Sequence, residues 1–192
     1  MINYAQKKDI ENTVKALEEG GVVLYPTDTI WGIGCDATNS QAVEKVFNIK
    51  GREKNKSLIV LMSGLTQLKK YVRNIPIIAY NLIADSKHPT TIIYSEAVNL
   101  AENAIAADGS IAIRIPDNEF CIQLIEAFGK PIVSTSANFS GEALAKSFNE
   151  IPTDLLLKMD YIVQFNQLQI NNQQASRIIK LNTNGSFIII RE

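Results

Sequence analysis

Histidine and cysteine are almost absent from this chain. Among its 192 residues there is one histidine, His88, and there are two cysteines, Cys35 and Cys121, which lie far apart in no CxxC pairing. A disulfide framework and a zinc cluster are therefore not indicated, and a multi-histidine metal site is excluded. His88 lies between Lys87 and Pro89 in a polar stretch typical of an exposed loop. We expect both cysteines to be small buried residues in a reducing compartment.

Long apolar runs and an excess of charge of one sign are also missing. The longest apolar runs, 58–62 and 187–190, are far shorter than the ~18 residues of a membrane-spanning helix. No apolar stretch of signal-peptide length follows Met1. The 19 basic and 20 acidic side chains give a net charge of −1, without the basic excess typical of nucleic-acid-binding proteins. With 46% hydrophobic residues we expect one globular, cytoplasmic domain, residues 1–192.

Helical and strand patterns alternate along the chain. Apolar residues recur at helical spacing in four segments, 10–17, 43–47, 65–72 and 120–128, and Ser40 is placed to cap the second of them. Short apolar runs predict eight strands, at 22–25, 58–62, 90–94, 110–115, 131–133, 161–165, 177–181 and 187–190. The interleaving predicts an α/β (or α+β) fold with a mixed sheet, antiparallel near its C-terminal end. The Asn- and Gln-rich segment 166–175 is predicted to be a surface loop.

The segment YPTDTIWGIGCDA, residues 25–37, places polar side chains directly after a predicted strand. That strand ends at Pro26, and Thr27, Asp28 and Thr29 follow at its carboxyl end. Ligands bind at this edge in open α/β sheets. An ordinary turn with hydrogen-bonded Thr and Asp side chains would use the same residues. Both interpretations are open at this point.

The same segment also matches a dinucleotide-binding pattern. Gly32, Gly34 and Ala37 satisfy G-x-G-x-x-G/A, and Glu53 lies about twenty residues further on. The pattern requires its first glycine immediately after the strand, whereas residues 26–31 intervene here. Its acidic residue should end the next strand, yet Glu53 precedes that strand and stands among lysines. We therefore do not expect a nicotinamide site.

The segment before the strand predicted at 58–62 contains four basic residues: Lys50, Arg52, Lys54 and Lys56. Because they recur at every second position, an extended segment would direct all four to one side. Glu53 alone offsets their charge. Such a cationic row suits a polyphosphate, and a solvated basic loop is the alternative. The chain has no GxxxxGK[ST] loop, so a nucleotide site here would not be of the Walker type.

Two further segments carry polar groups. The loop after the strand at 131–133 is rich in uncharged donors and acceptors, at Ser134, Thr135, Ser136, Asn138 and Ser140. These groups suit ribose hydroxyls, phosphate oxygens or an amino-acid head group, and a polar turn is the alternative. Arg114 interrupts the apolar strand at 110–115. A buried arginine needs an anionic partner, either within the protein or on a ligand.

In this order the segments resemble the YrdC-like family of threonylcarbamoyl-AMP synthases, in its single-domain form. The resemblance covers about residues 16–191 and is carried by YPTDTIWGIGCDA, by KGR with Lys56 ahead of LIVLM, by SIAIRIP, and by STSAN with Ser140-Gly141. It implies a single α/β domain with a twisted mixed sheet, flanking helices and a concave basic cleft. It also implies that L-threonine, bicarbonate and ATP form threonylcarbamoyl-adenylate and pyrophosphate, with Mg²⁺ held mainly through the ATP phosphates.

The resemblance also implies roles for individual residues. Lys50 and Arg52 would be catalytic through their contacts with the phosphates. Threonine contacts are implied for Thr29, Arg114, Ser134 and Ser176, and ATP contacts for Lys50, Arg52, Lys56, Ser110, Ser136, Asn138 and Arg191. The nucleophile would be a carbamate, which is already an anion, so no strong general base is needed. The product would pass to a tRNA threonylcarbamoyl transferase that modifies an adenosine beside the anticodon.

Three segments depart from the family pattern. Residues 86–91 replace the usual WPGPxT, Leu61 stands where some members have histidine, and residues 144–146 replace Ser-Pro-Thr. These departures keep one alternative open, a YciO-like paralogue without this activity. A second alternative is a protein that binds tRNA or double-stranded RNA on the basic concave surface.

Overall fold

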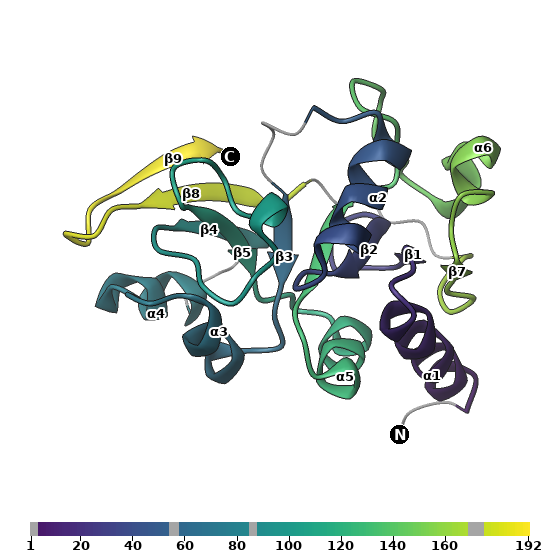
Figure 1. Ribbon diagram of the computed structural model, residues 1–192, viewed down its shortest axis with the longest axis horizontal. Coiled ribbons are helices and arrows are strands. Elements are labelled where there is room, and N and C mark those ends of the chain that lie inside the picture. The colour runs from purple at the N-terminus through teal and green to yellow at the C-terminus, as the bar shows by residue number, and fades with distance from the viewer. Residues whose placement is uncertain (1–3, 54–57, 85–87, 169–174) are drawn as a thin grey trace.

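The computed structural model describes residues 4–53, 58–84, 88–168 and 175–192. Across these residues nine strands form one sheet, in the order β7-β1-β2-β6-β3-β5-β4-β8-β9 (Figure 1). The strands are β1 (Val23–Tyr25), β2 (Gly32–Asp36), β3 (Ile59–Leu61), β4 (Thr90–Tyr94), β5 (Ile111–Arg114), β6 (Ile132–Ser136), β7 (Tyr161–Ile162), β8 (Arg177–Leu181) and β9 (Phe187–Arg191).

The sheet is mixed, as the sequence predicts. The pairs β1–β7, β3–β5 and β4–β8 are parallel, and the other neighbouring pairs, including β8–β9, are antiparallel. Six α-helices accompany it in the described residues: α1 (Tyr4–Glu18), α2 (Ser40–Lys50), α3 (Leu65–Tyr71), α4 (Ile77–Ala84), α5 (Glu119–Phe128) and α6 (Thr153–Leu156). The predicted α/β class is confirmed.

Alternation along the strands divides the apolar residues between two clusters. One cluster packs beneath α2, α3 and α4 and includes Trp31, Phe47 and Met62. The other lies beneath α1 and α5, which run side by side in Figure 1, and includes Tyr25 and Phe120. Because successive residues of a strand point to opposite faces, the strands β1, β3 and β6 supply side chains to both clusters.

The strand β2 is missing from the sequence prediction, because its glycines indicate a turn. Both Gly32 and Gly34 lie inside this strand, between β1 and β6. At Gly34 a Cβ atom would lie 2.4 Å from the Val133 carbonyl oxygen and 2.7 Å from the Tyr25 ring. Glycine is therefore required there by close packing, because Tyr25 fills the space that a side chain would take.

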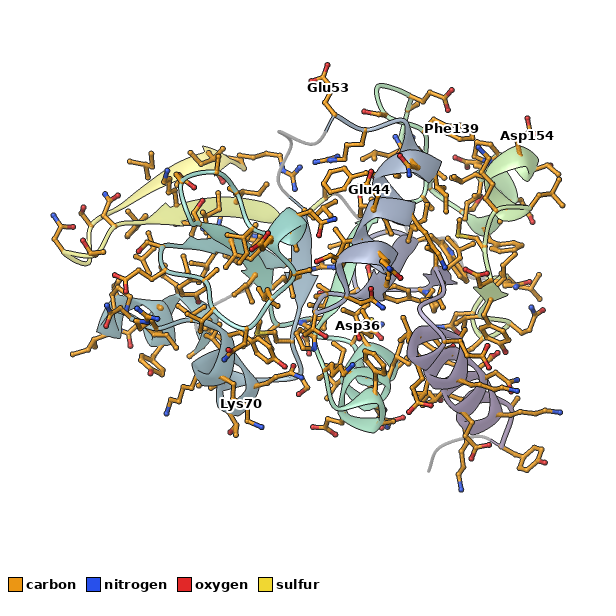
Figure 2. All side chains as sticks on the ribbon, viewed as in Figure 1. Asp36, Glu44, Glu53, Lys70, Phe139 and Asp154 are labelled. Atoms are coloured by element: carbon orange, nitrogen blue, oxygen red, sulfur yellow. The ribbon has the colours of Figure 1, made fainter. Side chains whose placement is uncertain are left out.

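The position of Gly32 and Gly34 inside β2 bears on the dinucleotide-binding pattern. A phosphate-binding loop needs its glycines between a strand and a helix N-terminus, not inside a strand. Glu53, the residue that would bind a ribose, is exposed, and Figure 2 shows it pointing away from the sheet. Gly32, Gly34 and Glu53 therefore do not have the arrangement of a dinucleotide-binding loop.

Other local expectations are corrected. The cap of α2 is Asn39, not Ser40, since the Asn39 Oδ1 accepts the N–H groups of Gln41 and Ala42. The helix α4 was not predicted, because apolar residues nearly all round it leave no stripe. Of the loop predicted at 166–175, residues 169–174 lie outside the described residues. No helix in the described ranges is long and apolar enough to cross a membrane.

A buried carboxylate joins α1 to the end of β7. Asp9 is 4% exposed, and it accepts hydrogen bonds from the Tyr161 hydroxyl at 2.6 Å and from the N–H groups of Gln164 (3.1 Å) and Phe165 (2.8 Å). Removing the acceptor would leave three part-buried donors without this partner.

We expect Asp9→Ala to lower the free energy of unfolding by about 3 kcal/mol, measured by urea titration. Glu11→Ala is the matched control, because Glu11 lies on the same helix with an exposed side chain 4.0 Å from Lys7. That variant should change the free energy of unfolding by less than about 0.5 kcal/mol. Equal effects of the two substitutions would contradict this role of Asp9.

Candidate ligand-binding site

A hollow of about 270 Å³ opens on the sheet face away from α2. Its floor follows from register: Ser134 of β6, Ile59 of β3, Ala112 of β5 and Ile93 of β4 are cross-strand neighbours, so their side chains share one face. Seven of the predicted site residues line it: Thr29, Arg52, Arg114, Ser134, Ser136, Ser176 and Arg191. Tertiary structure thus gathers side chains from widely separated parts of the sequence.

Arg114, at the end of β5, is 5% exposed and has its anionic partner within the protein. Its Nη1 lies 3.1 Å from the Asp28 Oδ1 and donates to the Thr29 hydroxyl at 3.0 Å. The Asp28 Oδ2 accepts the Asp117 N–H at 3.2 Å, which ties the loop after β1 to the loop after β5. The Arg114 Nε is buried and has no hydrogen-bond partner among the described residues.

Two residues of the loop after β1 have functions that the sequence analysis did not assign. Asp28 was noted only as a polar residue, yet it is the charge partner of Arg114. The Thr27 hydroxyl donates to the Ile30 carbonyl at 2.7 Å and accepts the Thr29 N–H at 3.0 Å. This local turn holds the Thr29 hydroxyl toward Arg114. The expected turn with hydrogen-bonded Thr and Asp side chains is present, and Thr27 and Thr29 of this turn line the hollow.

Lys50 and Asn138 lie behind the hollow and do not line it. The Lys50 Nζ, 2% exposed, donates to the main-chain carbonyls of Ser136 and Asn138 and to the Asn138 Oδ1. The Ser136 hydroxyl donates to the same Oδ1 at 2.6 Å, and the Asn138 Nδ2 donates to the Glu142 carbonyl at 2.7 Å. Lys50 therefore fixes the shape of the loop after β6.

Lys50 and Arg52 do not form the extended row of basic side chains that the sequence predicts. Lys50 lies in the last turn of α2, and Gly51 follows it in the left-handed conformation, with φ of 57°. This break directs Arg52 into the hollow while Lys50 points into the loop after β6. Burial lowers the pKa of Arg52 below its usual value. Lys54 and Lys56 lie outside the described residues.

Arg191 and Ser176 close the C-terminal side of the hollow. The Arg191 guanidinium donates to the Ser176 carbonyl from Nε (3.1 Å) and Nη2 (2.6 Å). The hydroxyls of Ser176 and Thr91 lie 2.7 Å apart. Burial lowers the pKa of Arg191, and the nearby Arg114 charge lowers it further. Like charges at this spacing favour an anion between them.

Ser110 lies in a neighbouring hollow. Its hydroxyl donates to the Asp108 Oδ1 at 2.5 Å, and the Lys180 Nζ lies 3.4 Å from the Asp108 Oδ2. This second hollow, about 350 Å³, shares Ile93 and Ala112 with the first. A ligand that contacts both Ser110 and Arg114 would have to extend across these two side chains.

The arrangement can bind an anion but holds no protein nucleophile or base of the usual kinds. Arg52, Arg114 and Arg191 surround hydroxyl groups, and an apolar side of the hollow includes Leu144. His88 is exposed, and Cys35 and Cys121 are buried free thiols whose pKa values burial raises strongly. Among the described residues no three His, Cys, Asp or Glu side chains could hold a metal ion together.

Lys50 gives the free energy of unfolding a defined pH dependence. Burial, and then the Arg52 charge, lower its pKa from 10.5 to about 8. Between these values the folded protein binds fewer protons than the unfolded chain, so this contribution to stability rises with pH.

We expect the free energy of unfolding of the wild type, minus that of Lys50→Met, to grow from about pH 8 to about pH 10. The slope should not exceed about 1.4 kcal/mol per pH unit. Urea titrations at several pH values measure it. A difference that stays constant over this range would mean that the three oxygens around Nζ outweigh burial and keep the proton bound.

Comparison with known proteins supports one family. The family model Sua5_yciO_yrdC, described as telomere recombination, matches residues 15–192. A protein of Vibrio vulnificus named threonylcarbamoyl-AMP synthase is 31% identical over 150 residues, which cover 77% of this chain and 81% of the relative.

Solved structures agree with this. The crystal structure of P. abyssi Sua5 complexed with L-threonine superposes with a TM-score of 0.87 at 26% identity. The alignment covers 97% of this chain and 54% of that one, so the chain spans about half the length of that protein. Escherichia coli YciO, at 23% identity, shares the fold with a TM-score of 0.83 over 97% of this chain and 89% of its own. With the family model matching nearly the whole chain, this protein belongs to the Sua5/YciO/YrdC family.

Proposed function

We propose that this protein is an L-threonylcarbamoyladenylate synthase, which forms threonylcarbamoyl-AMP and pyrophosphate from L-threonine, bicarbonate and ATP. The observation that carries the proposal is the meeting, in one hollow, of the residues expected for threonine (Thr29, Arg114, Ser134 and Ser176) with three of those expected for ATP (Arg52, Ser136 and Arg191). The threonine complex of the P. abyssi relative has the same fold.

In this proposal the amino acid binds at Arg114. Arg114 and the Thr29 hydroxyl line the hollow and would bind the carboxylate, while Asp28 keeps the guanidinium in place. Hydroxyls of Ser134 and Ser176 offer further hydrogen bonds at the same end of the hollow. The ligand carboxylate thus binds a guanidinium whose charge Asp28 already balances before the ligand is bound.

The proposed reaction requires only that the carbamate and the α-phosphorus are aligned and that the negative charge of the phosphates is stabilised. A carbamate oxygen of N-carboxythreonine attacks the α-phosphorus of ATP, the new O–P bond forms, and the bond to the β-phosphate oxygen breaks to release pyrophosphate. Arg52 and Arg191 stabilise the negative charge of the phosphates, and Ser136 donates to them. ATP phosphates would carry Mg²⁺, which neutralises charge; this fits a site without a carboxylate cluster among the described residues. The adenylate would then pass to the transferase that modifies tRNA.

The assay that tests the proposal is pyrophosphate release by purified protein with ATP, Mg²⁺, L-threonine and bicarbonate, each omitted in turn. We expect release only with the full mixture, together with threonylcarbamoyl-AMP detected by mass spectrometry. ATP binding without threonine-dependent release would contradict the proposal and favour a YciO-like paralogue. Salt-sensitive binding of RNA without turnover would instead favour the RNA-binding alternative.

Arg52→Ala should lower the turnover rate by about 10²-fold, because one cation facing the transferred phosphate is lost. Its effect on the melting temperature should be small, since Arg52 lies in a loop. Arg73→Ala is the control, an exposed arginine that does not line the hollow. Unchanged pyrophosphate release by Arg52→Ala, with a melting temperature several degrees lower, would assign Arg52 a structural role.

Arg114→Lys should raise the KM for L-threonine roughly tenfold or more and leave the KM for ATP nearly unchanged. Lysine keeps a positive charge beside Asp28 but lacks the Nε donor, so the buried ion pair is retained while ligand binding is impaired. Steady-state kinetics with threonine and ATP varied separately measure both constants. An unchanged KM for threonine would make Arg114 purely structural.

A further inference from the structure

Thr91 is a buried polar residue beneath the candidate site, and it has no role in the reaction described above. It lies on β4 two residues before Ile93, whose side chain lines the first hollow. Because side chains alternate along a strand, Thr91 points to the same face of the sheet as Ile93. Thr91 is 0% exposed and does not itself line the hollow. Any effect of its hydroxyl on a ligand must therefore pass through a neighbouring residue.

The neighbouring residue is Ser176, which directly precedes β8. The hydroxyl oxygens of Thr91 and Ser176 lie 2.7 Å apart, and Ser176 lines the hollow. Two main-chain contacts fix the backbone at this point. The Arg191 guanidinium donates to the Ser176 carbonyl, and the Arg177 N–H donates to the Pro89 carbonyl at 2.9 Å. Thr91 adds a third contact, to the side chain of Ser176.

The direction of the hydrogen bond between the two hydroxyls follows from their burial. Among the described residues the Thr91 hydroxyl has no hydrogen-bond partner besides the Ser176 hydroxyl. If Ser176 were the donor, the Thr91 proton would be buried without an acceptor, which is unfavourable. Ser176 lines the hollow, where water or a ligand can accept its proton. Thr91 is therefore the donor, and the Ser176 proton is available to a ligand.

We propose that Thr91 is a positioning residue, whose hydroxyl holds Ser176 as a hydrogen-bond donor toward an anionic oxygen of the ligand. Such an oxygen suits this hollow, because the guanidinium groups of Arg114 and Arg191 also line it. Both the amino-acid carboxylate and the ATP phosphates carry anionic oxygens. The inference rests on the proposed function only for the identity of the ligands, since the direction of the hydrogen bond follows from the hydroxyl pair alone.

Thr91→Val removes the donor and keeps a β-branched side chain, which strands favour. We expect the Kd for L-threonine to rise about five- to tenfold, measured by isothermal titration calorimetry, because Ser176 is no longer held as a donor. Thr91→Ser keeps the hydroxyl and should restore the wild-type Kd. Thr90→Val is the matched control, because Thr90 lies on the same strand with its side chain on the other face. This control should leave the Kd unchanged.

A double-mutant cycle tests whether the effect passes through Ser176. Once Ser176→Ala has removed the hydroxyl that Thr91 positions, Thr91→Val should weaken binding no further. We therefore expect the double variant to have the Kd of Ser176→Ala alone. Independent effects that multiply in the double variant would overturn the proposal. Thr91→Val with wild-type Kd values for both L-threonine and ATP would also overturn it.

Separate titrations with L-threonine and with ATP identify the oxygen that Ser176 contacts. Weaker binding of L-threonine alone assigns the contact to the carboxylate, and weaker binding of ATP alone assigns it to a phosphate. Equal losses for both ligands would indicate a general distortion of the hollow and overturn the proposal. These titrations do not require turnover, so a wild type that binds its ligands without releasing pyrophosphate contradicts only the proposed reaction. A wild type that binds neither ligand would overturn both.

Discussion

The ion pair between Arg114 and Asp28 is the interaction on which the candidate site depends. A guanidinium buried to this extent is costly unless a charge lies beside it, and removal of one partner from such a pair typically costs about 3–5 kcal/mol. Asp28 lies 3.1 Å away and also binds the Asp117 N–H, so one carboxylate joins two loops. The position of Thr29 follows from this, because its hydroxyl accepts a hydrogen bond from the same guanidinium.

A second constraint shapes the opposite side of the hollow. The Lys50 ammonium group takes the main-chain carbonyls of Ser136 and Asn138 as acceptors and so defines the loop after β6. The neighbouring strand β2 carries Gly34 where the Tyr25 ring and the Val133 carbonyl leave no room for a side chain. Both contacts involve β6, the strand that also carries Ser134 and Ser136 into the hollow.

Local patterns predict much of this fold. The apolar runs before Pro26 and Pro116 are strands, and the helical stripe at 120–128 is α5. The sequence analysis does not predict β2, because its glycines indicate a turn. It does not predict α4 either, because apolar residues nearly all round this helix leave no apolar stripe. The predicted burial of Cys35 and Cys121 and the exposure of His88 are confirmed, since both follow from residue type and immediate neighbours.

By itself the sequence determined the fold class and the motifs, because these depend on periodicity and residue type. Seven of the eleven site residues that the family resemblance implies line the hollow. Tertiary structure alone decided that Asp28 is the partner of Arg114, that Lys50 supports a loop behind the hollow, and that Ser110 faces a neighbouring one. These contacts join residues far apart in the chain. Strand order and register set their distances, and neither can be read from local pattern.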